Sequence, residues 1–317
     1  RAHRAPRLHG LDDQKTKRRE KPILLKALRE QFRRDLGEVY PQAEIELIFS
    51  MLAAHIFGFP RTILAMEPGR ELQDEDARLM LGALRDLCNH RPVQYIIGRA
   101  PFMEMDLQVS PAVLIPRPET AELVDWIREE VSPESAGLRM LDIGTGSGCI
   151  ALALKKYFSD AEVHALDLSK DALGVARSNA LEQQAEILLR QADICNPGSG
   201  WPSFDLIVSN PPYVPLRELE TMAPHVRDSE PHIALFASEG DPLVFYRCIC
   251  HFAAQFLKVE GQLFVEIHKD FGPEVVALFR ENGFGDIVLK KDIFGRDRFV
   301  RGRWKGSFFE GGNQKKT

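Results

Sequence analysis

The stretch RMLDIGTGSG, residues 139–148, decides the fold class. Its first five residues have the pattern of a buried strand, and they run into a glycine-rich turn that an apolar helical segment follows from Cys149. Glycines let the backbone approach a ligand without Cβ clashes at the carboxyl end of a strand, where open α/β sheets hold ligands. A dinucleotide fingerprint needs glycine at position 149, so this turn favours an adenosyl group over a pyrophosphate.

The same alternation of strand and helix continues along the chain. Helices are expected at 119–131, 148–158, 170–182, 241–257 and 273–282, and strands at 138–143, 162–167, 186–191, 204–209 and 261–267. This order predicts a mainly parallel, doubly wound sheet in a Rossmann-like α/β domain over residues 118–304. Two last strands, near 286–290 and 298–303, flank a Phe294-Gly295 turn and should form an antiparallel hairpin at one sheet edge.

The amino-terminal part has a different pattern. From Pro22 to about Cys88 the apolar residues recur at helical spacing, with glycine and proline breaks, which predicts a small all-helical domain over 20–91. Residues 92–117 are expected to be a linker with a hairpin, whose β-like patches lie near 95–97 and 107–109. The basic segment 1–19 and the polar tail 305–317 are expected to be disordered.

Composition narrows the class of protein. The 317 residues carry a formal net charge of −5 and no run of about 18 apolar residues, which argues against a membrane span and a broadly basic nucleic-acid surface. Five cysteines, an odd number, without a secretory segment favour buried free thiols in a reducing, cytoplasmic compartment. A mitochondrial location is the minor alternative, because residues 1–20 are rich in arginine. No metal site is expected, since Cys248 and Cys250 should point apart on a helix.

Acidic residues follow the next two strands at the same edge of the predicted sheet. Asp167 ends the second strand and can accept hydrogen bonds from both hydroxyls of a ribose. Asp193 follows the third and can accept from the adenine amino group, while Ile194 packs on the ring. Asp142 either favours a sulfonium electrostatically or braces the glycine turn. One such acid is usually a loop residue or helix cap, but three in register predict a site for S-adenosylmethionine (SAM).

The fourth strand leads into the tetrad Asn210-Pro211-Pro212-Tyr213. A planar NH2 group is held best by acceptors on its two N–H bonds, and the Asn210 side chain and the Pro211 backbone each offer a carbonyl. The prolines stiffen the loop and carry no N–H donor, and Tyr213 can stack on the planar group. Asn210, Pro211 and Tyr213 are therefore the candidate catalytic residues for methyl transfer to an amide nitrogen. The structural alternative is a turn with a packed tyrosine.

With these residues the chain resembles the HemK/PrmC family, the glutamine N5-methyltransferases of peptide chain release factors. The resemblance runs from the N-terminal helices to about residue 304. Beyond the glycine turn and the tetrad, it rests on the strings RPVQYIIG at 91–98 and LIPRPET at 114–120, on Phe102, on Glu230-Pro231 and Ala234-Leu235, and on residues 292–298.

The resemblance implies a class I SAM-dependent methyltransferase whose partners are release factors, with neither nucleic acid nor membrane bound directly. The acceptor is the glutamine of a Gly-Gly-Gln motif, seated on Asn210, Pro211, Pro212 and Tyr213, and the helical domain docks the release factor. The implied cofactor contacts are Gly144, Thr145, Gly146, Ser147, Gly148, Asp167, Ile194, Asn210 and, from the linker, Phe102.

Two segments depart from the family pattern, ASEGDP at 237–242 and EIHKDFG at 266–272. His268 in the second invites a general-base interpretation, although a single histidine after a strand is more often structural. One competing function is methylation of an exocyclic amine of adenine or guanine in nucleic acid, which would need a basic groove that residues 195–240 lack. Another is a silent scaffold, which would have lost a cofactor glycine, Asp167 or Asn210.

Overall fold

The computed structural model describes residues 22–59, 61–132, 137–222, 224–236 and 241–306. The chain divides into two compact units, Arg1–Cys88 and Asn89–Thr317. The predictions of disorder for residues 1–19 and most of 305–317 lie outside the described residues. Within those residues, no helix has both the length and the apolar content that crossing a membrane requires.

The first unit is all-helical, as its spacing predicts. It contains α1 (Leu25–Leu36), α2 (Gln42–Phe57), α3 (Arg61–Met66) and α4 (Asp74–Cys88). Phe32 of α1 and Phe49 of α2 are buried and meet edge to face, with ring centroids 5.1 Å apart. Met80 of α4 is fully buried as well. Each long helix therefore buries one apolar face in a common core.

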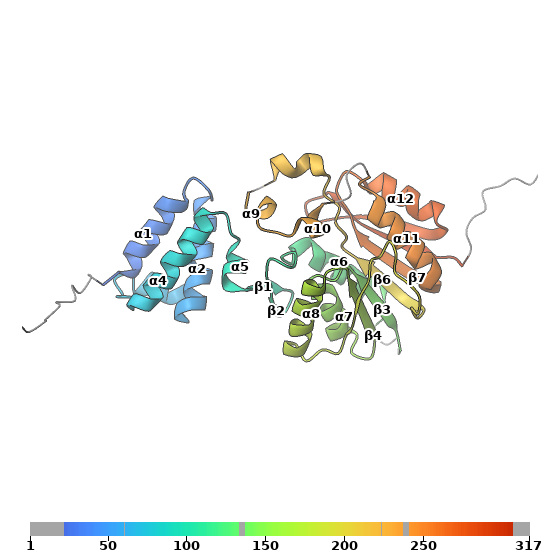
Figure 1. The fold of residues 1–317 in the computed structure, drawn as a ribbon, viewed down its shortest axis with the longest axis horizontal. Coiled ribbons are helices and arrows are strands. Elements are labelled where there is room, and N and C mark those ends of the chain that lie inside the picture. The colour runs from blue at the N-terminus through green and yellow to red at the C-terminus, as the bar shows by residue number, and fades with distance from the viewer. Residues whose placement is uncertain (1–21, 60, 133–136, 223, 237–240, 307–317) are drawn as a thin grey trace, which may run out of the picture. The chain divides into compact units, whose positions relative to one another are not determined.

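The second unit is built on a seven-stranded sheet of order β5-β4-β3-β6-β7-β9-β8. Strands β3, β4, β6 and β7 of this sheet are labelled in Figure 1. Strands β3 to β7 run parallel, while β9 pairs antiparallel with both β7 and β8. The fold class is confirmed, including the terminal hairpin at the sheet edge. The bounds are β3 Arg139–Ile143, β4 Glu162–Asp167, β5 Leu188–Gln191, β6 Phe204–Ser209, β7 Leu257–Glu266, β8 Phe284–Lys291 and β9 Asp297–Trp304.

Helices cover both faces of this sheet, because neighbouring residues of each strand point to opposite sides. Met140 of β3 joins the core under α6 (Pro118–Glu130) and α7 (Cys149–Tyr157). Leu141 joins the core under α11 (Val244–Phe256) and α12 (Gly272–Glu281). Helix α8 (Lys170–Glu182) contacts β4 and β5. Each helix and strand predicted from residue 119 onward is present, with ends shifted by a few residues.

Three short helical segments between β6 and α11 were not predicted. They are η1 (Leu216–Thr221), α9 (Pro224–Arg227) and α10 (His232–Leu235). The backbone N–H of Val214 donates to Leu235 O at 2.9 Å, so α10 lies beside the segment that follows the Asn-Pro-Pro-Tyr tetrad. The departure at 237–242 falls largely outside the described residues.

The segment 92–117 contains the predicted hairpin, but one of its predicted strands is wrong. The hairpin consists of β1 (Arg99–Phe102) and β2 (Met105–Gln108), whereas Val93–Ile97 form the short helix α5. Pro92 stands before its first turn, and Gly98, with φ +77°, ends it by donating its backbone N–H to Gln94 O at 2.7 Å. These end signals outweighed the β-branched residues that indicated a strand.

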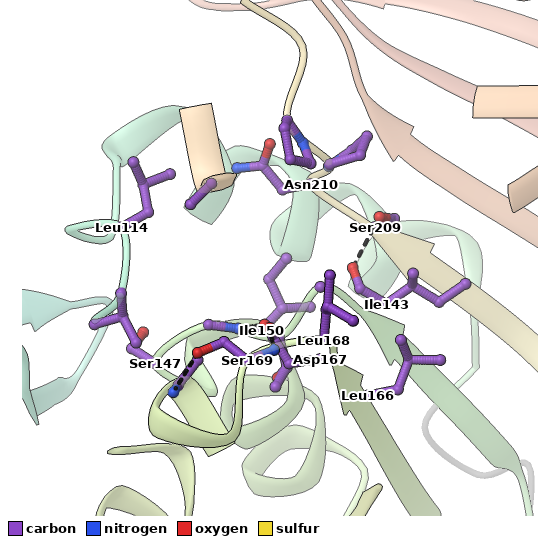
Figure 2. Close-up of a pocket in the computed structure, with 18 of the residues that line it drawn as sticks. Leu114, Ile143, Ser147, Ile150, Leu166, Asp167, Leu168, Ser169, Ser209 and Asn210 are labelled. Atoms are coloured by element: carbon purple, nitrogen blue, oxygen red, sulfur yellow. Dashed lines mark hydrogen bonds between the residues drawn. The ribbon is translucent and has the colours of Figure 1, made fainter. Parts of the chain in front are cut away.

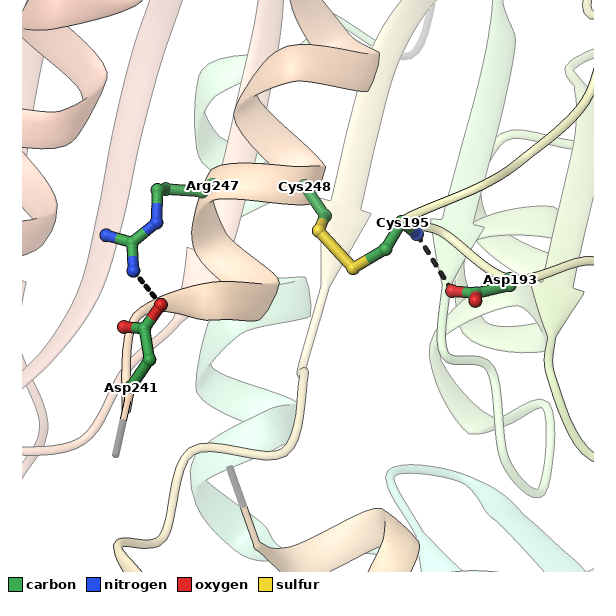
Figure 3. Close-up of a disulfide and its surroundings, with 5 residues drawn as sticks. All are labelled: Asp193, Cys195, Asp241, Arg247 and Cys248. Atoms are coloured by element: carbon green, nitrogen blue, oxygen red, sulfur yellow. Dashed lines mark hydrogen bonds and ion pairs between the residues drawn. A yellow bond between two sulfur atoms is a disulfide. The ribbon is translucent and has the colours of Figure 1, made fainter. Parts of the chain in front are cut away.

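The cysteine prediction also needs correction. Cys195 and Cys248 form a disulfide with a Cα separation of 4.9 Å (Figure 3), and Cys88 is exposed, so only Cys250 is a fully buried free thiol. The two bonded residues lie 53 positions apart, one after β5 and one on α11. They meet because the segment after β5 packs on α11, where Trp201 contacts Phe252 edge to face. Sequence spacing carries no sign of this approach.

Candidate active site

A cavity that is partly open to solvent lies at the carboxyl ends of β3, β4 and β6. Figure 2 shows Asn210 on the opposite side of this cavity from Asp167 and Ser147. The cavity brings together most of the predicted site residues: Gly144, Thr145, Gly146, Ser147, Asp167, Asp193, Ile194, Asn210, Pro211 and Pro212. Segments far apart in sequence therefore meet where the parallel sheet places them.

The glycine turn is held by its own neighbours. The backbone N–H groups of Gly144 and Thr145 both donate to Leu166 O, at 2.9 and 3.0 Å. Gly148 has φ +83°, and a Cβ there would stand 3.3 Å from the Cβ of Ala176. Gly148 itself is outside the cavity lining, so glycine is needed there for backbone conformation and close packing on α8.

Asp142 braces this turn and does not line the cavity. Its Oδ2 accepts from the Thr145 hydroxyl at 2.6 Å and from the Ala151 backbone at 3.2 Å, and the residue is fully buried. Burial raises the pKa of Asp142 to about 7. Of the two predicted roles for Asp142, the structure supports the bracing of the loop.

Asp167 lies at the end of β4, and each of its carboxylate oxygens accepts one hydrogen bond from the protein backbone. Oδ2 accepts from the Gly146 N–H and Oδ1 from the Ser169 N–H, each at 2.9 Å. Each oxygen keeps a further lone pair for a ligand hydroxyl. Burial raises the pKa of Asp167, so the fold alone disfavours this charge. A carboxylate whose ionisation is disfavoured by burial, and which lines a cavity, is typical of a functional site.

Asp193 and Ile194 form another part of the wall, just after β5. The Oδ1 of Asp193 accepts from the Cys195 N–H at 2.9 Å (Figure 3), which fixes the carboxylate beside the disulfide. The disulfide ties this wall to α11, whose Phe245 and Ile249 also line the cavity.

The Asn-Pro-Pro-Tyr loop is anchored by hydrogen bonds from both of its ends. Asn210 Nδ2 donates to Thr120 Oγ1 at 3.0 Å, and the Thr120 hydroxyl donates to Glu266 Oε2 at 2.8 Å. The Tyr213 hydroxyl donates to the other carboxylate oxygen, Oε1, at 3.0 Å. Glu266 is 1% exposed, at the end of β7. One buried carboxylate therefore supports the loop through two routes.

Besides Gly148, two predicted residues are not among those that line the cavity. Tyr213 is outside the lining, and burial followed by the charge of Glu266 raises its pKa, so its hydroxyl stays protonated as a donor. The stacking of Tyr213 on an acceptor stays a prediction. Phe102, the last residue of β1, is 3% exposed in the apolar core, and it is not among the described residues that line the cavity.

Three contributors were missed by sequence reasoning. Thr120 and Glu266 lie 146 positions apart, and Asn179 of α8 donates from Nδ2 to Ser147 O at 2.9 Å. Asn179 is fully buried and its Oδ1 accepts from the Gln108 N–H at 2.7 Å. An asparagine on the apolar face of a predicted helix was the available signal, because a buried amide must find partners.

His268 has a structural environment. Its Nε2 lies 3.3 Å from Glu218, and its Nδ1 accepts from the Asp270 backbone N–H at 3.3 Å. It is 5% exposed and outside the cavity lining. Glu218, His268 and Asp270 form a group with metal-ligand side chains, but the two histidine nitrogens already face different partners.

A parallel sheet with a glycine turn after β3, an acid after β4 and an Asn-Pro-Pro-Tyr loop after β6 defines a class I methyltransferase that uses SAM. Residues 122–226 match the family described as "Methyltransferase small domain", and residues 27–98 match "PrmC N-terminal domain". The chain belongs to the release factor glutamine methyltransferase family and is a SAM-dependent protein-glutamine methyltransferase.

Two of the relatives that carry the name release factor glutamine methyltransferase match this chain over most of its length. The one from Bacteroides thetaiotaomicron is 39% identical, over 84% of this chain and 96% of that protein. The one from Flavobacterium psychrophilum is 38% identical, over 88% of this chain and 99% of that protein. Among solved structures, the hMettl16 catalytic domain is 18% identical with a TM-score of 0.51, covering 75% of this chain and 85% of that one, which is a likeness of fold.

Proposed function

We propose that this enzyme transfers the methyl group of SAM to the side-chain nitrogen, N5, of the glutamine in the Gly-Gly-Gln motif of peptide chain release factors. The observation that carries the proposal is the hydrogen bond that Asn210 Nδ2 donates to Thr120 Oγ1. That bond leaves the Asn210 Oδ1 available to a ligand, and both Asn210 and Thr120 line the cavity. A carbonyl there suits an acceptor that brings N–H donors, as a glutamine amide does.

The cavity residues fit the cofactor. The spare lone pairs of Asp167 suit the two ribose hydroxyls, while Asp193 and Ile194 suit the adenine amino group and ring. Ser147 Oγ is buried beside the glycine turn without a hydrogen-bond partner among the described residues, which a ligand's polar group would satisfy. Gly144, Thr145, Gly146 and Gly148 shape the backbone around that ligand. When bound, SAM supplies an electrophilic methyl group on a sulfonium.

The chain's own contribution to chemistry is positioning. Asn210 Oδ1 and the Pro211 carbonyl would accept the two N–H bonds of the glutamine amide and aim its nitrogen at the methyl carbon. Pro211 and Pro212 offer no N–H that could compete for those acceptors. Alignment of this kind supplies much of the acceleration when the electrophile is already reactive.

The proposal is tested by incubating the protein with methyl-labelled SAM and a release factor, then locating the label by peptide mass spectrometry. We expect one methyl group on the Gly-Gly-Gln glutamine and none after that glutamine is replaced by alanine. Asn210→Asp should lower single-turnover methylation about 100-fold, because the lost donor and added charge misplace the nitrogen. Label on nucleic acid instead of the release factor would support the exocyclic-amine alternative and overturn the proposal.

We further propose that the helical unit docks the release factor. It is a compact unit with its own core, and none of its described residues is among those that line the cavity. A chain that begins at Asn89 should bind SAM normally but need a much higher concentration of release factor for half-maximal rate. Equal efficiency of the shortened and full-length chains would contradict docking.

A further inference from the structure

The hydrogen bonds behind Asn210 form a chain in which each donor determines the next. Above its pKa of about 7 the Glu266 carboxyl group is ionised and only accepts hydrogen bonds, so the Thr120 hydroxyl then gives its single proton to Glu266 Oε2, 2.8 Å away. Thr120 Oγ1 then has only lone pairs left for Asn210. The Asn210 group that faces it, at 3.0 Å, must therefore be the NH2 donor.

We propose that Glu266 and Thr120 are positioning residues that fix the orientation of the Asn210 amide, so that its oxygen faces the acceptor nitrogen. This inference rests on the proposed function, which assigns that oxygen to the acceptor. An asparagine amide can flip by half a turn with almost no change in shape, so packing alone does not select one orientation. The fixed direction of the Thr120 hydroxyl makes the selection.

The residues that select the orientation of the Asn210 amide are buried, so solvent has little access to the hydrogen bonds between them. Thr120 is 2% exposed and Glu266 1% exposed, and the second oxygen of Glu266 is occupied by the Tyr213 hydroxyl at 3.0 Å. The Tyr246 hydroxyl donates to the Glu266 backbone carbonyl at 3.2 Å, which anchors the end of β7. The carboxylate thus has a fixed place and fixed partners, and water does not compete for Thr120.

Glu266→Gln tests the direction of the chain with almost no change in size. The glutamine introduced at position 266 can keep its oxygen toward Tyr213 and turn its NH2 toward Thr120. The Thr120 hydroxyl is then free to donate to Asn210. The Asn210 amide then flips and presents its NH2 to the acceptor. We expect the single-turnover rate at saturating SAM to fall at least tenfold, while the dissociation constant for SAM changes less than about threefold.

Thr120 supplies a second pair of variants in case Glu266→Gln does not fold. Thr120→Val removes the hydroxyl at constant shape and should lower the rate similarly, whereas Thr120→Ser keeps the hydroxyl and should recover most of it. Glu130→Gln is the matched control, because Glu130 lies on the same helix as Thr120, α6, and accepts a hydrogen bond from Arg301 outside the cavity. It should leave the rate unchanged.

The outcomes separate this inference from the proposed function. If Asn210→Asp is impaired while Glu266→Gln and Thr120→Val both turn over at the wild-type rate, the positioning chain is wrong and the acceptor site stands. If Thr120→Ser is as slow as Thr120→Val, the effect is one of packing and the inference is also overturned. If wild-type protein does not label the release factor, the proposed function itself fails.

Discussion

Replacing Asp167 by alanine should separate cofactor binding from folding. The carboxylate accepts from Gly146 and Ser169 at 2.9 Å each, and we assign its remaining lone pairs to the two ribose hydroxyls of SAM. Hydrogen bonds to a charged group contribute about 1.5–3 kcal/mol each, and water replaces part of that when the group is lost. A net loss of about 3 kcal/mol corresponds to a dissociation constant raised roughly 100-fold.

The assay is calorimetric titration with SAM, accompanied by urea unfolding of the free protein. Since burial raises the pKa of Asp167, its charge is not a source of stability without the ligand, and the variant should remain folded. Asp171→Ala is the control, because Asp171 is an exposed acid in the first turn of α8. An unchanged dissociation constant in a folded Asp167→Ala protein would refute the ribose assignment.

Three further predictions concern stability. Cys195→Ser should lower the free energy of unfolding by up to about 4 kcal/mol, which is the chain-entropy value for a closed loop of 53 residues. Alkylation of Cys195 and Cys248 in the native protein without reductant would contradict the disulfide. Gly148→Ala should destabilise by about 1–2 kcal/mol in urea unfolding, because φ is +83° and the added Cβ meets Ala176, whereas a neutral effect would mean that the turn relaxes. Burial raises the pKa of Glu266 from 4.5 to about 7, so ionisation of Glu266 destabilises the folded state as pH rises through that interval. Between pH 4.5 and 8 the free energy of unfolding of Glu266→Gln should therefore rise by about 3 kcal/mol relative to that of the wild type. Parallel pH profiles of the two proteins would contradict the shift.

The sheet was predictable because its signals are local. Strand 139–143 and the turn after it carry both the apolar run and the glycines within ten residues. The acids at 167 and 193 and the loop at 210 follow their strands directly, so knowing that the strands are parallel was enough to place them at one edge. Ten of the predicted site residues accordingly line the cavity.

The rest depended on contacts between distant segments. Nothing in the sequence near Thr120 indicates that its hydroxyl meets Glu266, and Cys195 carries no mark of its proximity to Cys248. The hydrogen bond from the Tyr213 hydroxyl to the buried carboxylate behind the loop was likewise not indicated by the sequence, while stacking of the Tyr213 ring on the acceptor stays a prediction. Such pairings are decided by how helices pack on the finished sheet, which strand and helix periods do not encode.

The position of β9 has a consequence for how the enzyme is made. β9 lies between β7 and β8, and its Phe299 and Val300 are fully buried in the cores on opposite faces. During synthesis β8 emerges before it has any strand to pair with, and β7 lacks a neighbour on that side until Trp304 has been added. The helices of the first unit, by contrast, pair within a short span and can fold while translation continues. The helical unit of the nascent chain can thus fold early, whereas the seven-stranded sheet is complete only once β9 has been translated.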